Sequence, residues 1–451
     1  MDKTKLLLAA HKSGEGACLL FLFSAPLSIA VNNIALAATA LAAAAFLAIK
    51  GVDCWRRLAP CGSQWTALAF TSLSILSVIF AEEPKQALYR LPSILLLIAA
   101  PLVFMPFVGS TLITRNWSNV LLLGIVLGLV VIIIKGPAAN SIIPRYAPFM
   151  GLMNYAGALA LLAPVIFGCL IASSFAGDHR HTLLFTVSFS GITLGALHSG
   201  TRIAWLSIVV TTFFLLFVNI RNLTWRLVAI MFVLTAAVMS FFFLNSFLSD
   251  RLASIDPFYH KKSQNTNIAP QDKASQQSTN SSSQIVSVAP SNVSSQSALS
   301  NRIRIALWKD AIKRLPDLPF FGFGPGGGYH YSENANNKPD GQKPLTGGHY
   351  HNTLLTIVIE MGIPGAVALL ALFIPSLVLA AQNLRHPNPR FRQWAKILFA
   401  LILAVFIHSM TDTLFQIKTT VQLFTFLLIM CWANLQKTED TQIPLDNKSL
   451  S

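Results

Sequence analysis

Long apolar segments alternate with short polar connections along most of the chain, and this pattern predicts helices that cross a membrane. A helix needs about 20 mostly apolar residues to span the hydrocarbon core of a bilayer. The first two apolar segments run almost together, and we place the turn between them at Asn32-Asn33. The twelve segments that qualify are 16–32, 33–49, 65–81, 92–108, 118–134, 149–174, 183–199, 203–219, 227–246, 352–380, 397–411 and 419–436.

The composition agrees with an all-α polytopic membrane protein of about 12 transmembrane helices. Of the 451 residues, 53% are hydrophobic and 11% are charged, and the mean hydropathy is +0.58. A soluble protein carries about 25% charged residues. The first apolar segment resembles an ordinary span, so we expect no cleavable signal peptide.

The distribution of Lys and Arg predicts the orientation of the helices, because short loops rich in these residues stay in the cytoplasm. One alternating set of connections, which includes both termini, carries sixteen Lys and Arg, whereas the short loops of the opposite set carry six. Both termini are therefore predicted to be cytoplasmic. The net charge of +15 partly reflects this bias, and we do not interpret it as binding to nucleic acid.

The cysteines exclude two kinds of site. None of the five lies in the long external loop, so no disulfide-stapled external domain is expected. No spacing typical of a zinc site occurs either. Cys54 and Cys61 share a loop, but this loop is predicted to face the reducing cytoplasm.

One long external loop separates the ninth and tenth predicted helices. It divides the chain into residues 1–246 with nine helices, the loop 247–350, and residues 351–451 with three helices and a cytoplasmic tail. The insert 263–300 is mostly Ser, Gln, Asn, Ala and Val. Such a stretch cannot bury enough apolar surface to fold, so we expect it to be disordered. An amphipathic helix is predicted near 301–314.

The spacing of apolar residues in this last segment is helical. Ile305, Trp308 and Ile312 fall on one face, while Lys309 and Lys313 lie elsewhere. Such a helix is suited to lying on the surface of the membrane.

Several arginines are predicted on the external side, although Lys and Arg are usually concentrated on the cytoplasmic side. A guanidinium offers a planar fork of donors that suits phosphate oxygens. Arg202 follows a small Gly-containing connection, and Arg304 lies on the predicted surface helix, so the two are candidates for holding a pyrophosphate. Arg302 lies two residues away and is an alternative to Arg304. Arg90 and Arg145 are further candidates, although anchoring at the membrane interface is the favoured role for both.

The polar run Gly-Gly-His-Tyr-His-Asn at 347–352 comes immediately before an apolar helix. The positive end of a helix keeps a neighbouring imidazole neutral, as a general base requires. His351 is therefore a candidate base, with His349 and His330 as competitors. A metal site at His349 and His351 needs extended backbone and acidic partners, and no acidic cluster accompanies them.

Other polar groups near the predicted spans have structural interpretations. Glu360, within the tenth helix, and Asp412, at an external helix end, are expected to pair with basic groups. The glycine-rich run 322–326 neither follows a strand nor opens a helix, so it is not a nucleotide-binding fingerprint. ATP-driven chemistry is therefore not expected.

Four motifs lie on the predicted external side, and they are Gly151-x-x-Asn154, Ser199-x-x-Arg202, Arg304-x3-Trp308 with Gly322-x-Gly324, and His351-Asn352-x9-Gly362-x-x-Gly365. In order, spacing and placement they resemble the motifs of the O-antigen ligase family, within the wider ligase and polymerase superfamily. The resemblance covers roughly residues 150–415 together with the layout of the twelve helices. The insert 263–300 departs from the pattern, in a loop that varies greatly within the family.

The resemblance implies a membrane glycosyltransferase of the GT-C type in the inner membrane of a Gram-negative bacterium. Such an enzyme transfers a glycan from undecaprenyl diphosphate to lipid A–core at the periplasmic face, in lipopolysaccharide biosynthesis. It implies an inverting reaction with no metal and no cofactor. His351 corresponds to the base, and Arg202 and Arg304 neutralise the leaving diphosphate. The candidates for substrate contacts are Arg302, His349, Tyr350, Asn352, Arg145 and Arg90.

Three other functions remain open from the sequence. An O-antigen polymerase and a protein O-oligosaccharyltransferase use the same donor, although the placement of His351 just after the long loop favours a ligase. A flippase for lipid-linked oligosaccharides, or another transporter, is expected to carry charges near the middle of the membrane. Most ionisable residues here gather at the membrane surfaces, which favours an enzyme.

Overall fold

A computed structural model describes residues 3–50, 59–135, 147–150, 152–199, 201–220, 304–305, 307–326, 350–410 and 417–436. The chain divides into two units, the first formed by residues 1–229 and 311–451 and the second by residues 230–310. In the second unit the structure describes residues 304, 305 and 307–310, which are helical. The predicted ninth span, 227–246, and the insert 263–300 lie outside the described residues.

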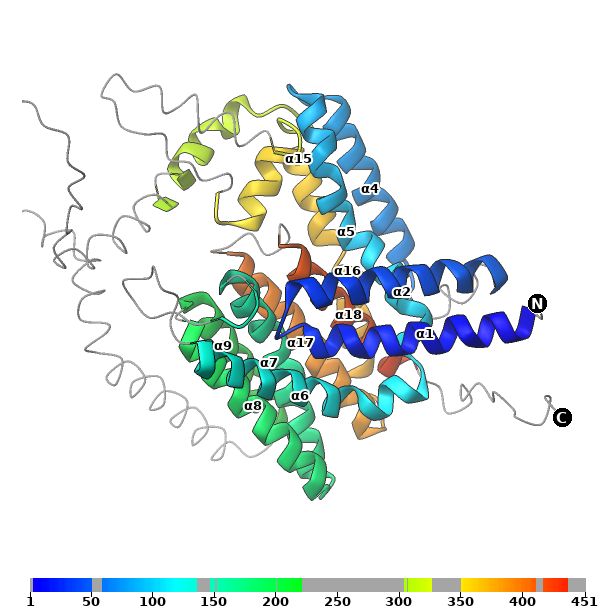
Figure 1. Cartoon of the computed structure of the whole chain (residues 1–451). Coiled ribbons are helices and arrows are strands. Elements are labelled where there is room, and N and C mark those ends of the chain that lie inside the picture. Colours follow the sequence, from blue (N-terminus) through cyan, green and yellow to red (C-terminus); the bar gives the residue numbers. More distant parts are fainter. Residues whose placement is uncertain are drawn as a thin grey trace, which may run out of the picture. The chain divides into compact units, whose positions relative to one another are not determined.

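The described part of the chain is helical and contains no β-strand. Nine of its helical segments, with α15 and α16 counted as one, are long and apolar enough to cross a membrane, which confirms the all-α polytopic class, and α4 and α9 are shorter apolar helices. The helices (Figure 1) are α1 (Lys3–Ser24), α2 (Ile29–Lys50), α4 (Ser63–Ile79), α5 (Pro84–Val108), α6 (Thr111–Lys135), α7 (Leu152–Phe175), α8 (His179–Ser199), α9 (Arg202–Asn219), α15 (Thr353–Ala371), α16 (Ile374–Asn383), α17 (Pro389–Ser409) and α18 (Lys418–Leu435).

The predicted turn at Asn32-Asn33 is wrong, because the first break in the chain lies between Ser24 and Ile29. Pro26 within this break disfavours helical backbone in the residue before it. Asn32 lies instead inside α2 and is buried. Its side-chain nitrogen donates to Gln422 Oε1 of α18 at 3.2 Å, so this amide links two helices within the apolar core.

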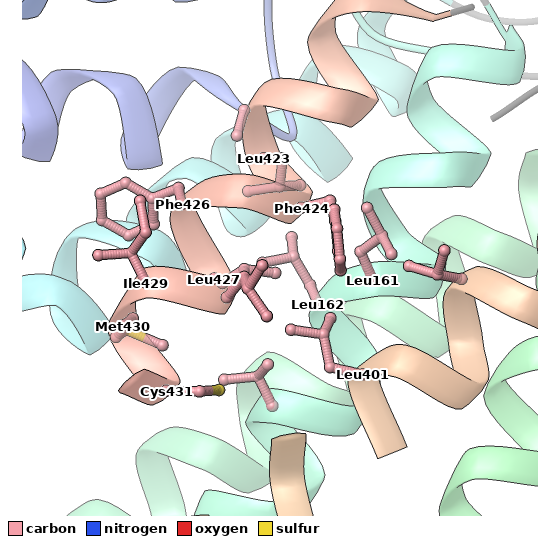
Figure 2. Close-up of a cluster of buried hydrophobic side chains, with 14 of the residues drawn as sticks. Leu161, Leu162, Leu401, Leu423, Phe424, Phe426, Leu427, Ile429, Met430 and Cys431 are labelled. Carbon is pink, nitrogen blue, oxygen red and sulfur yellow. The ribbon is translucent and has the colours of Figure 1, made fainter. Parts of the chain in front are cut away.

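Helix α18 is the most deeply buried element, since every residue from Thr419 to Leu435 is buried. A helix that is apolar all round belongs in the interior of a bundle. Its Phe424 and Leu427 lie beside Leu161 of α7 and Leu401 of α17 in a continuous apolar cluster (Figure 2). The packing of α7 and α17 around α18 fixes where the ends of these helices lie, and their ends carry the candidate site.

The predicted tenth span, 352–380, consists of two helices in the structure. Helix α15 contains a break at Gly362, where φ is 71° and ψ is 179°, and α16 begins at Ile374. Backbone that leaves the helical path within a membrane needs hydrogen-bond partners from elsewhere in the protein. Helix α15 lies beside α4 (Figure 1), and the hydrogen-bond partners at this break come from α4 and from the loop 320–326.

Candidate functional site

His351 and Asn352 form a rigid entry to α15. Asn352 is the N-cap residue, and its side-chain oxygen accepts a hydrogen bond from the backbone N–H of Leu355 at 2.9 Å. Its side-chain nitrogen donates to the backbone oxygen of Met410, at the end of α17, at 3.0 Å. One amide therefore caps one helix and ties it to the end of another. This double role explains why a residue with both a donor and an acceptor follows His351.

The backbone of His351 is left-handed, with φ at 49°. Among the described residues it is the one non-glycine residue with positive φ, a conformation that Asn, Asp and His tolerate better than other residues. Its side chain is half-buried, and the preceding Tyr350 is 2% exposed. Backbone outliers of this kind cluster at functional sites. The cap thus holds the backbone of His351, which carries the imidazole, in an unusual conformation.

Replacing Asn352 by Ala is expected to lower stability by roughly 2 kcal/mol, because it removes a helix cap and an interhelical hydrogen bond. Asn352→Ser keeps a side-chain acceptor for the N–H of Leu355 and loses the hydrogen bond to Met410, so about half of this loss is expected. The measurement is the denaturation midpoint of each variant.

The matched control for this cap is Asn388, which caps α17 through the backbone N–H of Arg390 at 2.9 Å. Asn388→Ala is expected to cost about 1 kcal/mol, as a lost cap does elsewhere. Equal losses of stability from the two Ala variants would show that the hydrogen bond from Asn352 to Met410 adds nothing to the helix cap.

A buried polar cluster lies close to Met410, whose backbone oxygen accepts the hydrogen bond from Asn352. His408 is fully buried, and a methyl group at Gly157 of α7 would lie 3.8 Å from its Nε2 and 3.2 Å from Thr420 Oγ1. The buried hydroxyls of Ser409, Thr419 and Thr420 have no hydrogen-bond partner within the described structure. Sequence reasoning missed His408, and the available signal was the polar pair His408-Ser409 near the end of a predicted apolar segment.

Arg202 begins α9, and its side chain lies outside the described part of the structure. Its backbone reaches the same end of the bundle, because Ala204 packs with Ala156 and Ala160 in the first turns of α7. These small side chains allow the two helices to approach closely. The start of α9 and the buried polar cluster therefore share the N-terminal end of α7.

Backbone groups of a distant loop fill the break in α15. The N–H groups of Phe323 and Gly324 donate to the carbonyl oxygens of Ile359 and Glu360, each at 2.9 Å. These carbonyls lie just before Gly362, where the helix is interrupted. We call this contact between residues 320–326 and 359–362 the glycine clasp. It explains how a polar break persists inside an apolar helix, since the loop meets its hydrogen-bonding needs.

Two glycines make the clasp possible. Gly322 has φ at 72°, and a Cβ atom there would lie 2.5 Å from the carbonyl carbon of Glu360 and from the backbone nitrogen of Gly362. A Cβ at Gly362 would in turn overlap the carbonyl oxygen of Phe320. The Gly-x-Gly and Gly-x-x-Gly motifs of the sequence are thus the two halves of one contact.

Glu360 of α15 stabilises the glycine clasp through two further hydrogen bonds. Its Oε1 accepts a hydrogen bond from the backbone N–H of Gly326 at 3.0 Å, and its backbone oxygen also accepts from Ser77 Oγ of α4 at 2.7 Å. Arg90 of α5 acts electrostatically on this carboxylate, and its Cγ would lie 3.2 Å from a Cβ at Gly326. Arg90 therefore lies at the loop end of the clasp, next to a glycine-rich turn.

The match to known proteins covers the clasp and the helix cap. Residues 187–370 match the family model described as O-Antigen ligase. These residues are an O-antigen ligase domain. No curated protein matches the chain significantly. The match supports a glycosyltransferase function of the O-antigen ligase and polymerase type, in lipopolysaccharide biosynthesis, for this multi-pass membrane protein.

The O-antigen ligase domain does not contain the whole site. Both halves of the clasp, the start of α9 and the cap at Asn352 lie within residues 187–370. Ser77 and Arg90 precede this range, while His408 and Met410 follow it. Helices outside the matched range therefore complete the surroundings of the cap and the clasp.

Several predicted site residues lie outside the described structure, namely His330, His349, Arg302, Arg145 and Asp412. Arg304 is described, is helical and belongs to the second unit. Within the described residues, no group of three His, Cys, Asp or Glu side chains is arranged to hold a metal ion.

Proposed function

We propose that the protein is an O-antigen ligase, which transfers a glycan from undecaprenyl diphosphate to lipid A–core at the periplasmic face of a Gram-negative inner membrane. The observation that carries this proposal is the helix cap, which holds His351 in a left-handed backbone beside the end of α17. Both termini are cytoplasmic in this proposal, because Lys and Arg are concentrated on that side. The periplasmic loop 247–350 separates residues 1–246 from residues 351–451.

In the proposed reaction, His351 removes the proton from the acceptor hydroxyl of lipid A–core. The acceptor oxygen attacks the anomeric carbon of the donor sugar, and the bond from this carbon to the diphosphate oxygen breaks. Its electron pair leaves with undecaprenyl diphosphate, so one displacement inverts the anomeric centre. The proton on His351 then passes to water or to the released diphosphate. The positive end of α15 favours the neutral imidazole that accepts the proton.

Arginines supply the electrostatic part of the proposed mechanism. Negative charge grows on the leaving diphosphate, and fixed guanidinium groups lower the barrier by stabilising it. Arg202 and Arg304 have this role, with Arg302 as the alternative to Arg304. The remaining candidates for substrate contacts are Arg90, Arg145, His349, Tyr350 and Asn352.

A ligation assay tests the function directly. Purified protein, undecaprenyl-diphosphate glycan and lipid A–core are combined, and product size is read on a gel. A ligase transfers glycan only when lipid A–core is present. A polymerase lengthens the glycan on the donor without this acceptor, and a protein O-oligosaccharyltransferase requires a protein acceptor. A flippase moves the donor across a proteoliposome and forms no new bond.

Transfer is expected to continue at an unchanged rate after exhaustive chelation with EDTA. The reason is that arginines, rather than a divalent ion, neutralise the leaving diphosphate in the proposed mechanism. The check is the initial rate before and after chelation. A loss of activity that Mg²⁺ or Mn²⁺ restores would refute the metal-free mechanism.

A further inference from the structure

An exposed aromatic surface adjoins the clasp. Phe80 is 60% exposed, Phe320 is 71% exposed and Ile363 is 65% exposed. The rings of Phe80 and Phe321 stack with centroids 5.0 Å apart and an interplanar angle of 10°. Phe320 meets Phe321 edge to face, also at 5.0 Å. We call these four side chains the aromatic patch.

The patch is built from three elements that the clasp holds together. Phe80 is the C-cap residue of α4, Phe320 and Phe321 precede Gly322 in the loop, and Ile363 follows the break in α15. The carbonyl of Phe320 lies against Gly362, so the patch and the clasp share backbone. A surface supported in this way keeps its shape, unlike single apolar side chains on a lipid-facing helix.

Charge lies a short distance along the same loop. Five residues lie between Phe320 and Gly326, and a chain of six Cα–Cα steps spans at most about 22 Å. A Cβ atom at Gly326 would lie 3.2 Å from Arg90 Cγ. The clasp thus has an apolar surface at the Phe320 end of the loop, and Arg90 of α5 lies beside the Gly326 end. This pattern matches an amphiphile with an anionic head and a long apolar tail.

We infer that the aromatic patch binds the isoprenoid tail of the lipid-linked glycan donor, next to its diphosphate. This inference rests on the proposed function, which supplies the donor. Isoprene units are flat and methyl-branched, so they pack well against the faces of stacked rings. Burying one phenylalanine side chain is worth roughly 1.5–3 kcal/mol, which corresponds to at least a tenfold change in affinity.

The test compares two donors that carry the same glycan diphosphate. One has the full undecaprenyl tail, and the other has a short tail of citronellyl length. The variants are Phe80→Ala and Phe321→Ala, and the matched control is Trp65→Ala. Trp65 is an aromatic residue on the same helix as the Phe80 cap, is 68% exposed and lies near the opposite end of α4.

We expect both phenylalanine variants to raise the KM for the undecaprenyl donor about tenfold, at unchanged kcat, and to leave the short donor unaffected. Trp65→Ala is expected to match the wild type with both donors. Equal changes with both donors, or loss of activity with both, would assign the rings to folding of the clasp and overturn the inference. If Trp65→Ala raised the KM as much as Phe80→Ala, the aromatic rings would serve general contact with lipid, and the inference would also be overturned. If the wild type transfers glycan from neither donor, the proposed function itself fails.

Discussion

Replacing His351 by Asn is expected to abolish glycan transfer while the protein still folds and inserts. Asparagine tolerates the left-handed backbone that His351 adopts, so the cap at the start of α15 remains. A general base contributes about 10²–10⁴-fold to a rate, and a loss of this size in kcat is expected. The measurement is the initial rate of transfer to lipid A–core, with the denaturation midpoint as the test of folding.

Two further variants separate proton transfer from positioning. His351→Gly also accepts positive φ, and it leaves space in which added imidazole can act as the base. Partial recovery of the rate with imidazole supports proton transfer, whereas no recovery together with normal donor binding would indicate a positioning role. His386→Asn, at a histidine in the connection between α16 and α17, is the control and should be fully active. Normal transfer by His351→Asn would exclude His351 as the base.

Much of the fold could be predicted from hydropathy, because a segment that crosses lipid must satisfy its backbone internally and a helix does so. Eleven of the twelve predicted segments overlap helices in the described part of the chain, although the first of them includes the break between α1 and α2. The turn at Asn32 was wrong because a polar pair looks the same whether it faces solvent or joins two buried helices. The link from Asn32 to Gln422 depends on packing between helices at opposite ends of the chain.

The candidate site was predictable in its local parts and hidden in its long-range ones. The helix that begins just after His351 follows from the polar run and the apolar segment beside it. The pairing of Gly322 with Gly362 has no local signal, since each glycine is compatible with an ordinary loop or helix break. Glu360 was expected to pair with a basic group, and its bond to a backbone N–H of the loop depends on the same pairing.

Replacing Gly322 by Ala is expected to disrupt the glycine clasp. Among the variants proposed here for stability, it should cause the largest loss. A left-handed backbone costs an alanine roughly 1–2 kcal/mol. The new Cβ would also lie 2.5 Å from backbone atoms of Glu360 and Gly362, and backbone cannot rotate away as a side chain can. A shift of the loop backbone would strain the hydrogen bonds from Phe323 and Gly324 to α15. Each of these bonds costs about 1–3 kcal/mol if it is left unmade. A total of at least about 3 kcal/mol is expected.

The control separates backbone conformation from crowding at the clasp. Gly62 has φ at 84°, close to that of Gly322, yet a Cβ there would meet no atom within 4 Å. Gly62→Ala should therefore show only the conformational cost of about 1–2 kcal/mol and retain transfer. Gly322→Ala and Gly362→Ala should lose both stability and transfer, because the loop that places Gly326 beside Arg90 is no longer held against α15. Denaturation midpoints and transfer rates of the three variants decide the matter, and equal losses at Gly62 and Gly322 would mean that the clasp contributes nothing beyond its turn.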